Sequence, residues 1–202
     1  MAGVGERKQR SDKKREVKPL IPVDAKEVIF RLSHITHTPL KDVGEFLTVF
    51  MLQDKDALTD LSEHFKRSVG IDNTLYNGNI NARTIDKRLR VPSDLVAIRF
   101  KRIDFERICV LAFALDCTPT RATAVLLEQA TRDIKAVNEY VYINMKHELT
   151  DGQMNELRKV LSYVNRYNNN SHSWMSLLSS IVGDIRPATK KLYELVNEFL
   201  KQ

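Results

Sequence analysis

A period of two in the side chains from Leu95 to Lys101 constrains the fold more than any other feature of this chain. Val96, Ile98 and Phe100 place an apolar side chain at every second position, and this period of two predicts a β-strand with one buried face. A lone strand leaves backbone donors and acceptors unpaired along both edges, so it is not stable by itself. The segment therefore has to pair with a second strand, from this chain or from another copy.

Two helices are predicted after this strand, joined by a short turn. Asp104 is the expected N-cap of the first helix, and apolar residues then recur at helical spacing. Thr118-Pro119 ends that pattern and opens the second helix, with Thr118 as its N-cap. The apolar stripe of the second helix predicts that it continues to about Met145. Elsewhere, Asp54 or Asp56 and Thr150 are expected to cap further helices.

The order strand, helix, turn, helix over residues 95–130 resembles the ribbon-helix-helix (Arc/MetJ/CopG-like) family of DNA-binding proteins. The resemblance is carried by the run LVAIRFKRIDFERICVLAFALDCTPTRATAVLLEQA. Its family-like positions are Phe105, Ile108, Leu111 and Ala112 in the first helix and Asp116-Cys117-Thr118 in the turn. At the position of Asp116, members of the family often have a small residue or glycine. The resemblance implies that two strands pair into an antiparallel ribbon above helices, and that this ribbon enters the major groove of DNA.

In that arrangement the outward-facing residues of the strand are the candidates for reading base edges. These residues are Ala97, Arg99 and Lys101. Arg99 can bond O6 and N7 of guanine, and Ala97 can contact the methyl group of thymine. The N-terminus of the second helix offers unpaired N–H groups to phosphate. The candidate phosphate anchors there are Thr118, Thr120 and Arg121.

An earlier segment, residues 18–51, repeats the same order of elements, with Thr38 as the expected N-cap of its second helix. A shift of 79 in the numbering places Ile21 on Phe100, whereas the two Thr-Pro pairs, at Thr38 and Thr118, need a shift of 80. We therefore hypothesise a tandem duplication, with two ribbon-helix-helix halves that pair within one chain or across a dimer. Pro19 and Pro22 count against it, because a proline in a strand lacks the N–H of the ladder. Further candidate DNA contacts are Arg15, Lys18, Leu20 and Leu95.

The positive charge of the chain is concentrated at its N-terminus. The formal net charge is +6, and residues 1–18 carry seven basic and three acidic residues. Residues 1–17 show no apolar periodicity, so we expect a disordered basic arm. Such an arm on a nearly neutral body suits attraction to phosphate.

The whole chain is expected to be mainly α, since Gly (7) and Pro (6) are scarce among 202 residues. We divide it into the arm, 1–17; a first ribbon-helix-helix-like half with one more helix, 18–67; a loop or linker, 68–93; the ribbon-helix-helix unit, 94–146; and a C-terminal helical module, 147–202. The C-terminal module holds Trp174 in a moderately apolar helix. We expect it to pack on the core, to form an oligomer contact or to offer a docking face to a protein partner.

Several classes of protein are not expected from this sequence. No apolar run approaches the length of a membrane span and no signal-peptide pattern is present, so we expect a cytoplasmic protein with no membrane partner. Cys109 and Cys117 are too few for a disulfide framework and are expected to be buried thiols. His34 and His37 lack a third metal ligand nearby. No nucleophile, phosphate-binding or zinc motif appears, so we expect no enzyme, no cofactor and no metal.

The expected function is sequence-specific binding of double-stranded DNA by a β-ribbon, as a homo-oligomer or as an intramolecular pseudo-dimer. The resemblance suggests an accessory protein of a plasmid or mobile element, acting in the relaxosome, partition or copy control, or as a transcriptional repressor. The alternative is an all-helical protein-interaction adaptor with an incidental basic arm. The segment Leu95–Lys101 discriminates between them, because a helix there, or a buried Arg99, would remove the DNA-binding ribbon.

Overall fold

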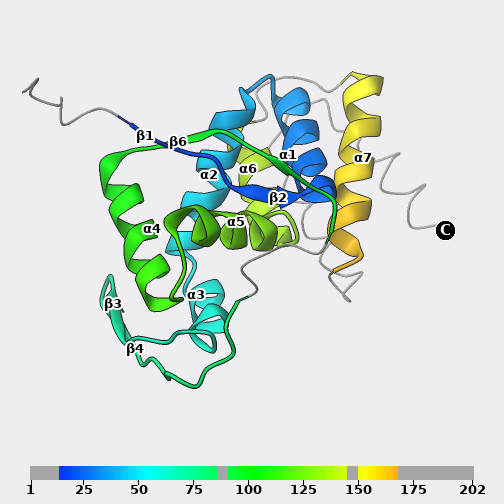
Figure 1. Ribbon diagram of the computed structural model, residues 1–202. Helices are drawn as coiled ribbons and strands as arrows, with labels where there is room; N and C mark the ends of the chain where they lie inside the picture. The colour runs from blue at the N-terminus through cyan, green and yellow to red at the C-terminus, as the bar shows by residue number, and fades with distance from the viewer. Residues whose placement is uncertain (1–13, 86–90, 145–149, 168–202) are drawn as a thin grey trace, which may run out of the picture.

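The computed structural model describes residues 14–85, 91–144 and 150–167, and in these parts the chain is mainly helical with small antiparallel sheets (Figure 1). The elements are β1 (Arg15–Val17), β2 (Leu20–Pro22), α1 (Val23–Thr36), α2 (Leu40–Gln53), α3 (Lys55–Ser62), β3 (Val69–Ile71), β4 (Thr74–Tyr76), β5 (Ser93–Leu95), β6 (Ile98–Phe100), α4 (Arg102–Ala114), α5 (Pro119–Ala130), α6 (Ile134–Asn144) and α7 (Asp151–Asn165).

Two stretches far apart in the sequence pair into one antiparallel ribbon, which we define as residues 15–22 with residues 93–100. β1 pairs with β6 and β2 pairs with β5 in the same register. Between the two pairs, the N–H of Val96 donates to the carbonyl oxygen of Pro19 at 3.1 Å. The strand predicted around residues 95–101 therefore has its partner in the same chain.

The ribbon has one buried and one exposed face. The alternation holds over residues 16–21 and 95–100, where the buried side chains are Val17, Pro19, Ile21, Val96, Ile98 and Phe100. The exposed side chains between them are Glu16, Lys18, Leu20, Leu95, Ala97 and Arg99. At the β2–β5 end it stops, since Pro22 is buried and Asp94 is exposed. The alternation predicted for residues 95–101 is confirmed, and the first strand follows the same rule.

The two prolines of the first strand have different consequences for the ribbon. Pro19 lies at a position that faces its partner strand, where it accepts from Val96 but has no N–H to return. Pro22 lies at a position whose backbone nitrogen faces away from the partner strand, because in an antiparallel pair only every second residue bonds across. The neighbouring residue makes the cross-strand bond instead: the N–H of Val23 donates to the carbonyl oxygen of Pro92 at 3.0 Å. Pro22 therefore removes no ladder bond, and only Pro19 weakens the first strand in the way that the sequence suggested.

The centre of the core lies beneath the ribbon, where α2 and α5 pack against each other. α2 lies under β6 and α5 lies under β2 (Figure 1). Gly44 permits the close approach of α2, since a Cβ at this position would lie 2.8 Å from Cδ1 of the buried Ile98. The inner face of the ribbon and the two helices thus close one apolar core.

The elements on either side of the ribbon repeat with a constant offset in residue number. α1 begins at Val23 and α4 at Arg102, which is an offset of 79, and α2 and α5 begin in the same relation. The left-handed residues that end α1 and follow α4 keep this offset too; they are His37, with φ 54°, and Asp116, with φ 53°. Asp116 thus takes the left-handed conformation that glycine adopts most easily.

Several predicted boundaries were wrong. The N-cap of α2 is Pro39 rather than Thr38, so the Thr-Pro pairs are not structurally equivalent and the offset of 79 holds through the turn. Asp104 lies in the first turn of α4, whose N-cap is Lys101. The helix expected to reach Met145 is instead two helices, since Asp133 accepts from the N–H of Ala136 at 3.0 Å and starts α6.

Two expected irregular regions also contain regular structure. Residues 15–17, assigned to the disordered arm, form β1, because they pair with β6. The expected loop over residues 68–93 contains the β3–β4 hairpin, with Asp72 in the left-handed region at its turn (φ 49°). The hairpin docks on α4 through an ion pair between Arg107 and Asp72. Its turn needed a residue that tolerates positive φ, which Asp supplies.

The remaining helices cover the sides of the core. Among the described residues, α7 packs along α1, where Gln153 Nε2 donates to the carbonyl of Ile35 at 3.1 Å and Arg31 pairs with Glu156. Thr150 caps α7 through a capping box with Gln153, which confirms the predicted cap. The predicted segment around Trp174 lies outside the described residues.

Within the described residues, no helix taken singly has both the length and the apolar character needed to cross a membrane. α4 and α5 pass such a test only when joined, and they are bent by 96° from one another.

Candidate nucleic-acid interface

The exposed face of the ribbon brings together six side chains, three from each strand, and we call this set the outer face: Glu16, Lys18, Leu20, Leu95, Ala97 and Arg99. Glu16 lies directly opposite Arg99, and Leu20 lies directly opposite Leu95. The shared register places Lys18 opposite Ala97. All members except Glu16 are candidates that the sequence had singled out.

Glu16 organises the charged part of the outer face. Its carboxylate lies 3.2 Å from Nε of Arg99 and 3.1 Å from Nζ of Lys18. Hydrogen bonds from Lys18 and then from Arg99 hold the pKa of Glu16 below its ordinary value. These side chains are 40–61% exposed, so the contacts orient the two cations more than they stabilise the fold.

Glu16 is the residue of this face that the sequence prediction missed. The assignment of residues 1–17 to a disordered arm removed it from consideration. The signal that could have found it is the alternation Glu16, Val17, Lys18, which extends the period of the following strand towards the N-terminus.

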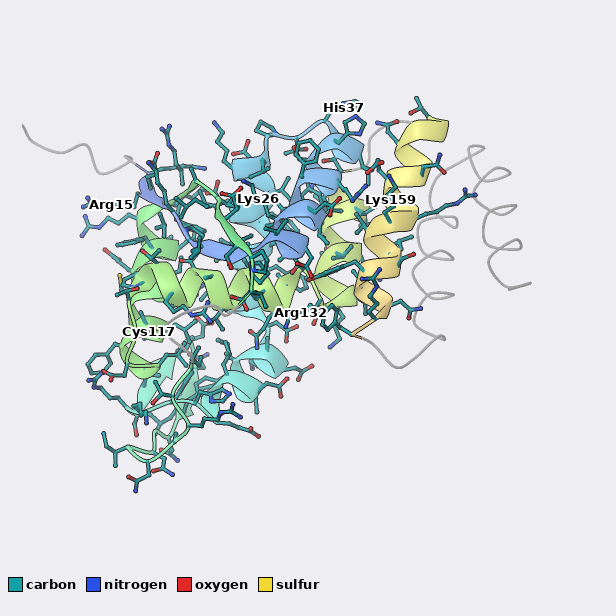
Figure 2. The ribbon with its side chains drawn as sticks, turned by 45° about the vertical axis from the view of Figure 1, so that its right-hand side comes forward. Arg15, Lys26, His37, Cys117, Arg132 and Lys159 are labelled. Carbon is teal, nitrogen blue, oxygen red and sulfur yellow. The ribbon has the colours of Figure 1, made fainter. Side chains whose placement is uncertain are left out.

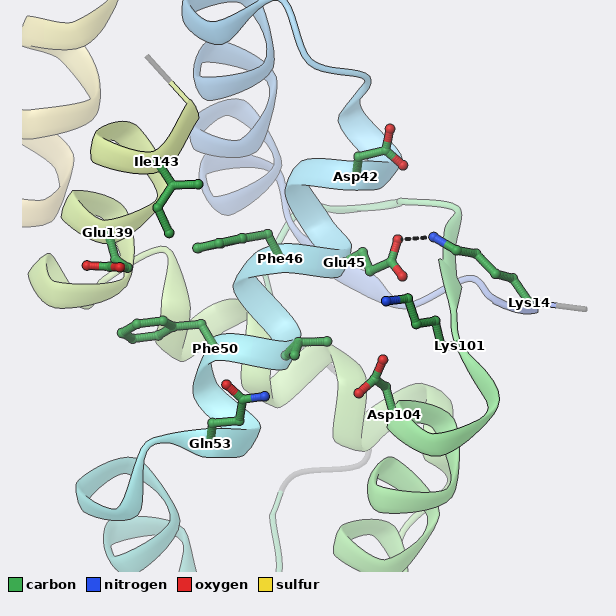
Figure 3. Close-up of a pocket in the computed structure, with 11 residues that line it drawn as sticks. Lys14, Asp42, Glu45, Phe46, Phe50, Gln53, Lys101, Asp104, Glu139 and Ile143 are labelled. Carbon is green, nitrogen blue, oxygen red and sulfur yellow. Dashed lines mark hydrogen bonds and ion pairs between the residues drawn. The ribbon is translucent and has the colours of Figure 1, made fainter. Parts of the chain in front are cut away.

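Lys101 is separated from the other two predicted base readers. Ala97 and Arg99 are exposed on the outer face, whereas Lys101 lies beyond the end of β6 as the N-cap of α4. Its side chain lines a groove beside α2, together with Lys14 (Figure 3). Lys101 is therefore a neighbour of the outer face rather than a member of it.

The groove beside Lys101 is an open hollow of about 580 Å³ with an apolar floor and a charged rim. Phe46 and Phe50 of α2 form part of the floor (Figure 3). The rim holds the lysines Lys14 and Lys101 and the acidic residues Asp42, Glu45, Asp104 and Glu139. Lys14 pairs with Glu45 at 2.5 Å. The acidic excess of this rim disfavours phosphate.

The three predicted phosphate anchors at the N-terminus of α5 differ in how accessible they are. Thr118 is the N-cap, and its Oγ1 accepts from the N–H of Arg121 at 3.2 Å. Thr120 is exposed. Nη1 of Arg121 lies 2.8 Å from Oε1 of Glu128, and only 14% of the Arg121 side chain and 15% of the Glu128 side chain are exposed. Thr118 and Thr120 are thus accessible, whereas Arg121 is engaged in an internal ion pair.

Arg15, the remaining predicted contact, lies at the end of the ribbon and is exposed (Figure 2). Its cross-strand neighbour is the buried Phe100. By the alternation of the strand, Arg15 therefore belongs to the opposite side from Arg99. It borders the outer face without forming part of it.

The other chemistry-bearing residues do not gather into a site. In the described ranges no group of three His, Cys, Asp or Glu side chains is placed to hold a metal ion. The rings of His34 and His37 are 6.4 Å apart, and Nε2 of His37 lies 2.9 Å from Nε2 of Gln153. Cys109 and Cys117 form no disulfide, and both are half-buried rather than fully buried.

Comparison of the chain with protein-family models, with curated proteins and with solved structures found no significant match.

Proposed function

We propose that the chain binds double-stranded DNA through the outer face of the ribbon, as a ribbon-helix-helix protein. The observation that carries this proposal is an antiparallel ribbon of two strands with one face buried on helices and the other open. Such a ribbon fits the major groove, which is about 12 Å wide. Arg99 is 59% exposed on this surface, which supports its role in reading guanine.

Both halves of the DNA-binding unit come from one chain in this proposal. The constant offset of 79 in residue number between equivalent elements supports a tandem duplication. The pairing of the two strands and the packing of α2 on α5 support an intramolecular pseudo-dimer. The active unit is then a monomer, and its DNA affinity does not depend on a protein dimerisation step.

Base reading and phosphate attraction are carried by different parts of the chain. The outer face holds Lys18 and Arg99 against Glu16, which leaves a net charge of about one. Phosphate contacts therefore come mainly from other groups: the N-terminus of α5 with Thr118 and Thr120, Arg15, and the basic residues that precede the ribbon. Such contacts position the protein without reading sequence.

The biological process we propose follows the family resemblance. The protein acts as an accessory factor of a plasmid or mobile element, in transfer, partition or copy control, or represses transcription of its own operon. Each of these roles requires the same recognition of duplex DNA.

The test is binding of the purified chain to labelled fragments of its own genetic element, measured by fluorescence anisotropy over a range of salt concentrations. The Arg99→Ala variant is compared with Lys135→Ala, which removes one positive charge from an exposed ion pair with Asp56 that joins α6 to α3, outside the ribbon. We expect Arg99→Ala to weaken binding to the preferred fragment by about 1–3 kcal/mol and to relax sequence preference. Lys135→Ala is expected to leave the preference unchanged.

Equal effects of the two variants would mean that only net charge matters and would reject a base-reading ribbon. Absence of binding to any fragment at low salt would reject the function altogether.

A second candidate function, a protein-interaction adaptor, has one observation in its favour. α4 exposes three apolar side chains, Ile103 at 63%, Val110 at 39% and Phe113 at 55%. The equivalent helix of the first half, α1, is instead covered by α7. If the DNA titrations are negative, the exposed apolar surface of α4 is the place to look for a protein partner.

A further inference from the structure

We infer that the DNA target is a directional, non-palindromic site, with a G·C pair at one end of the ribbon and thymine at the other. This inference rests on the proposed function and specifies its ligand. It follows from a difference between the two halves: their buried residues are equivalent in character, whereas their exposed residues are not.

The ribbon has a local two-fold centre between Lys18 and Ala97. The two strands pair in one register, and residues whose numbers differ by 79 occupy equivalent places in the two halves. Lys18 and Ala97 lie opposite each other in the ribbon, and their numbers also differ by 79, so the two-fold centre lies between them. If the two halves had the same sequence, the two ends of the ribbon would be identical. An ordinary two-fold symmetric ribbon reads a palindromic site for this reason.

The inner face keeps this symmetry in chemical character. Val17 corresponds to Val96, and Ile21 corresponds to Phe100, so both halves place apolar side chains on the core. Packing requires this equivalence, because either half has to cover the same pair of helices.

The outer face breaks the symmetry at each of its three pairs of equivalent positions. Glu16 corresponds to Leu95, Lys18 to Ala97 and Leu20 to Arg99. Because the strands run antiparallel, the two apolar residues meet at one end and the carboxylate and guanidinium meet at the other. The surface offered to DNA therefore has a charged end and an apolar end.

The charged end fits a G·C pair. Arg99 can donate to O6 and N7 of guanine, and a glutamate accepts from the N4 amino group of cytosine. Glu16 and Arg99 lie 3.2 Å apart across the ribbon, so they can address the two bases of one pair or of adjacent pairs.

The apolar end fits thymine. Leu20 and Leu95 lie opposite each other and are 45% and 54% exposed, with no polar atom in either side chain. The only apolar group in the major groove is the C5 methyl of thymine. Four residues along a strand separate the two ends, which is about 13 Å, or about four base pairs at about 3.4 Å each.

The first experiment selects bound sequences from a library of randomised duplexes with the full chain. We expect a non-palindromic motif with a G·C pair about four base pairs from a thymine. Replacing that thymine by uracil, which lacks the methyl group, is expected to weaken binding about fourfold per methyl contacted.

The second experiment restores the symmetry of the face. The triple variant Glu16→Leu, Lys18→Ala, Leu20→Arg gives the first half the exposed residues of the second. All three positions are exposed, so circular dichroism and thermal unfolding are expected to match the parent. Selection with this variant is expected to yield a palindromic motif with G·C pairs at both ends.

The outcomes separate the inference from the function on which it rests. A palindromic motif from the parent chain, or the parent motif retained by a folded triple variant, overturns the inference while DNA binding stands. Failure to enrich any sequence, with no binding at low salt, overturns the proposed function itself.

Discussion

The ion pair between Arg121 and Glu128 offers a direct test of the structure, because the sequence had assigned Arg121 to phosphate. Only 14% of the Arg121 side chain and 15% of the Glu128 side chain are exposed, and Nη1 of Arg121 lies 2.8 Å from Oε1 of Glu128. Arg121→Ala would leave the carboxylate of Glu128 largely buried without this partner. A hydrogen bond between charged groups contributes about 1.5–3 kcal/mol, and this range is our expected loss of unfolding free energy.

The assay is urea unfolding followed by circular dichroism, with thermal unfolding as a second measure. A loss of this size corresponds to a fall in Tm of about 3–12 °C for a chain of this length. The double variant Arg121→Met, Glu128→Met removes both charges and keeps the bulk of the side chains, so it is expected to recover most of the stability. With the single variants Arg121→Met and Glu128→Met, this double variant completes a double-mutant cycle, whose coupling energy should exceed about 1 kcal/mol.

Two results would refute this reasoning. One is a loss of less than about 0.5 kcal/mol on Arg121→Ala, the size of an ordinary surface substitution. The other is unchanged stability with a large loss of DNA affinity, which would return Arg121 to the phosphate-anchoring role.

Three further predictions follow from the geometry. Phe100→Ala should lower the unfolding free energy by about 3–5 kcal/mol and Ile98→Ala by about 2–5 kcal/mol in urea unfolding, since both side chains are fully buried. Arg99→Ala, between them, should change it by less than about 0.5 kcal/mol. Equal losses from all three variants would contradict the alternation of the strand. Burial raises the pKa of Tyr140 in the folded protein. The contribution of the protonated Tyr140 to folding stability is therefore complete below the unfolded pKa of about 10 and is lost as the pH rises further. Tyr140→Phe should therefore show a smaller fall in Tm between pH 9 and pH 11, to be judged against the parent under identical buffers. Burial, with a contribution from Glu106, raises the pKa of Cys109. Iodoacetamide should therefore label Cys109 more slowly in the native chain than in urea. Equal labelling rates, followed by mass spectrometry, would count against the burial of Cys109.

The parts of the fold that depend on local pattern were predictable from sequence. The alternation around Ile98 predicts the strand, and Thr118 and Thr150 are recognisable as helix caps because a hydroxyl before an apolar periodic run has that specific use. Of the two candidate caps for α3, Asp54 is the one that the structure uses, and it accepts from the N–H of Asp56 at 2.8 Å.

The parts that depend on long-range pairing could not be read from local pattern. β1 is short and follows a charged run, so only its partner β6 makes it a strand. The break before α6 was missed because apolar periodicity continues on both sides of Asp133, while the cap is formed by one carboxylate. Glu16 entered the candidate site only when the register of the ribbon was known.

The pairing of the ribbon also determines the order in which the chain can fold during synthesis. The paired positions lie far apart along the chain, from Pro22 with Ser93 to Arg15 with Phe100. At about 5–20 residues per second, the first strand waits about 4–17 s for its partner to be made. Throughout this interval Val17 and Ile21 lack their partner strand, residues 93–100, so the ribbon that places their apolar side chains in the core cannot form. Two nascent chains on one messenger can exchange halves during the wait, and the product is a domain-swapped dimer with two complete ribbons.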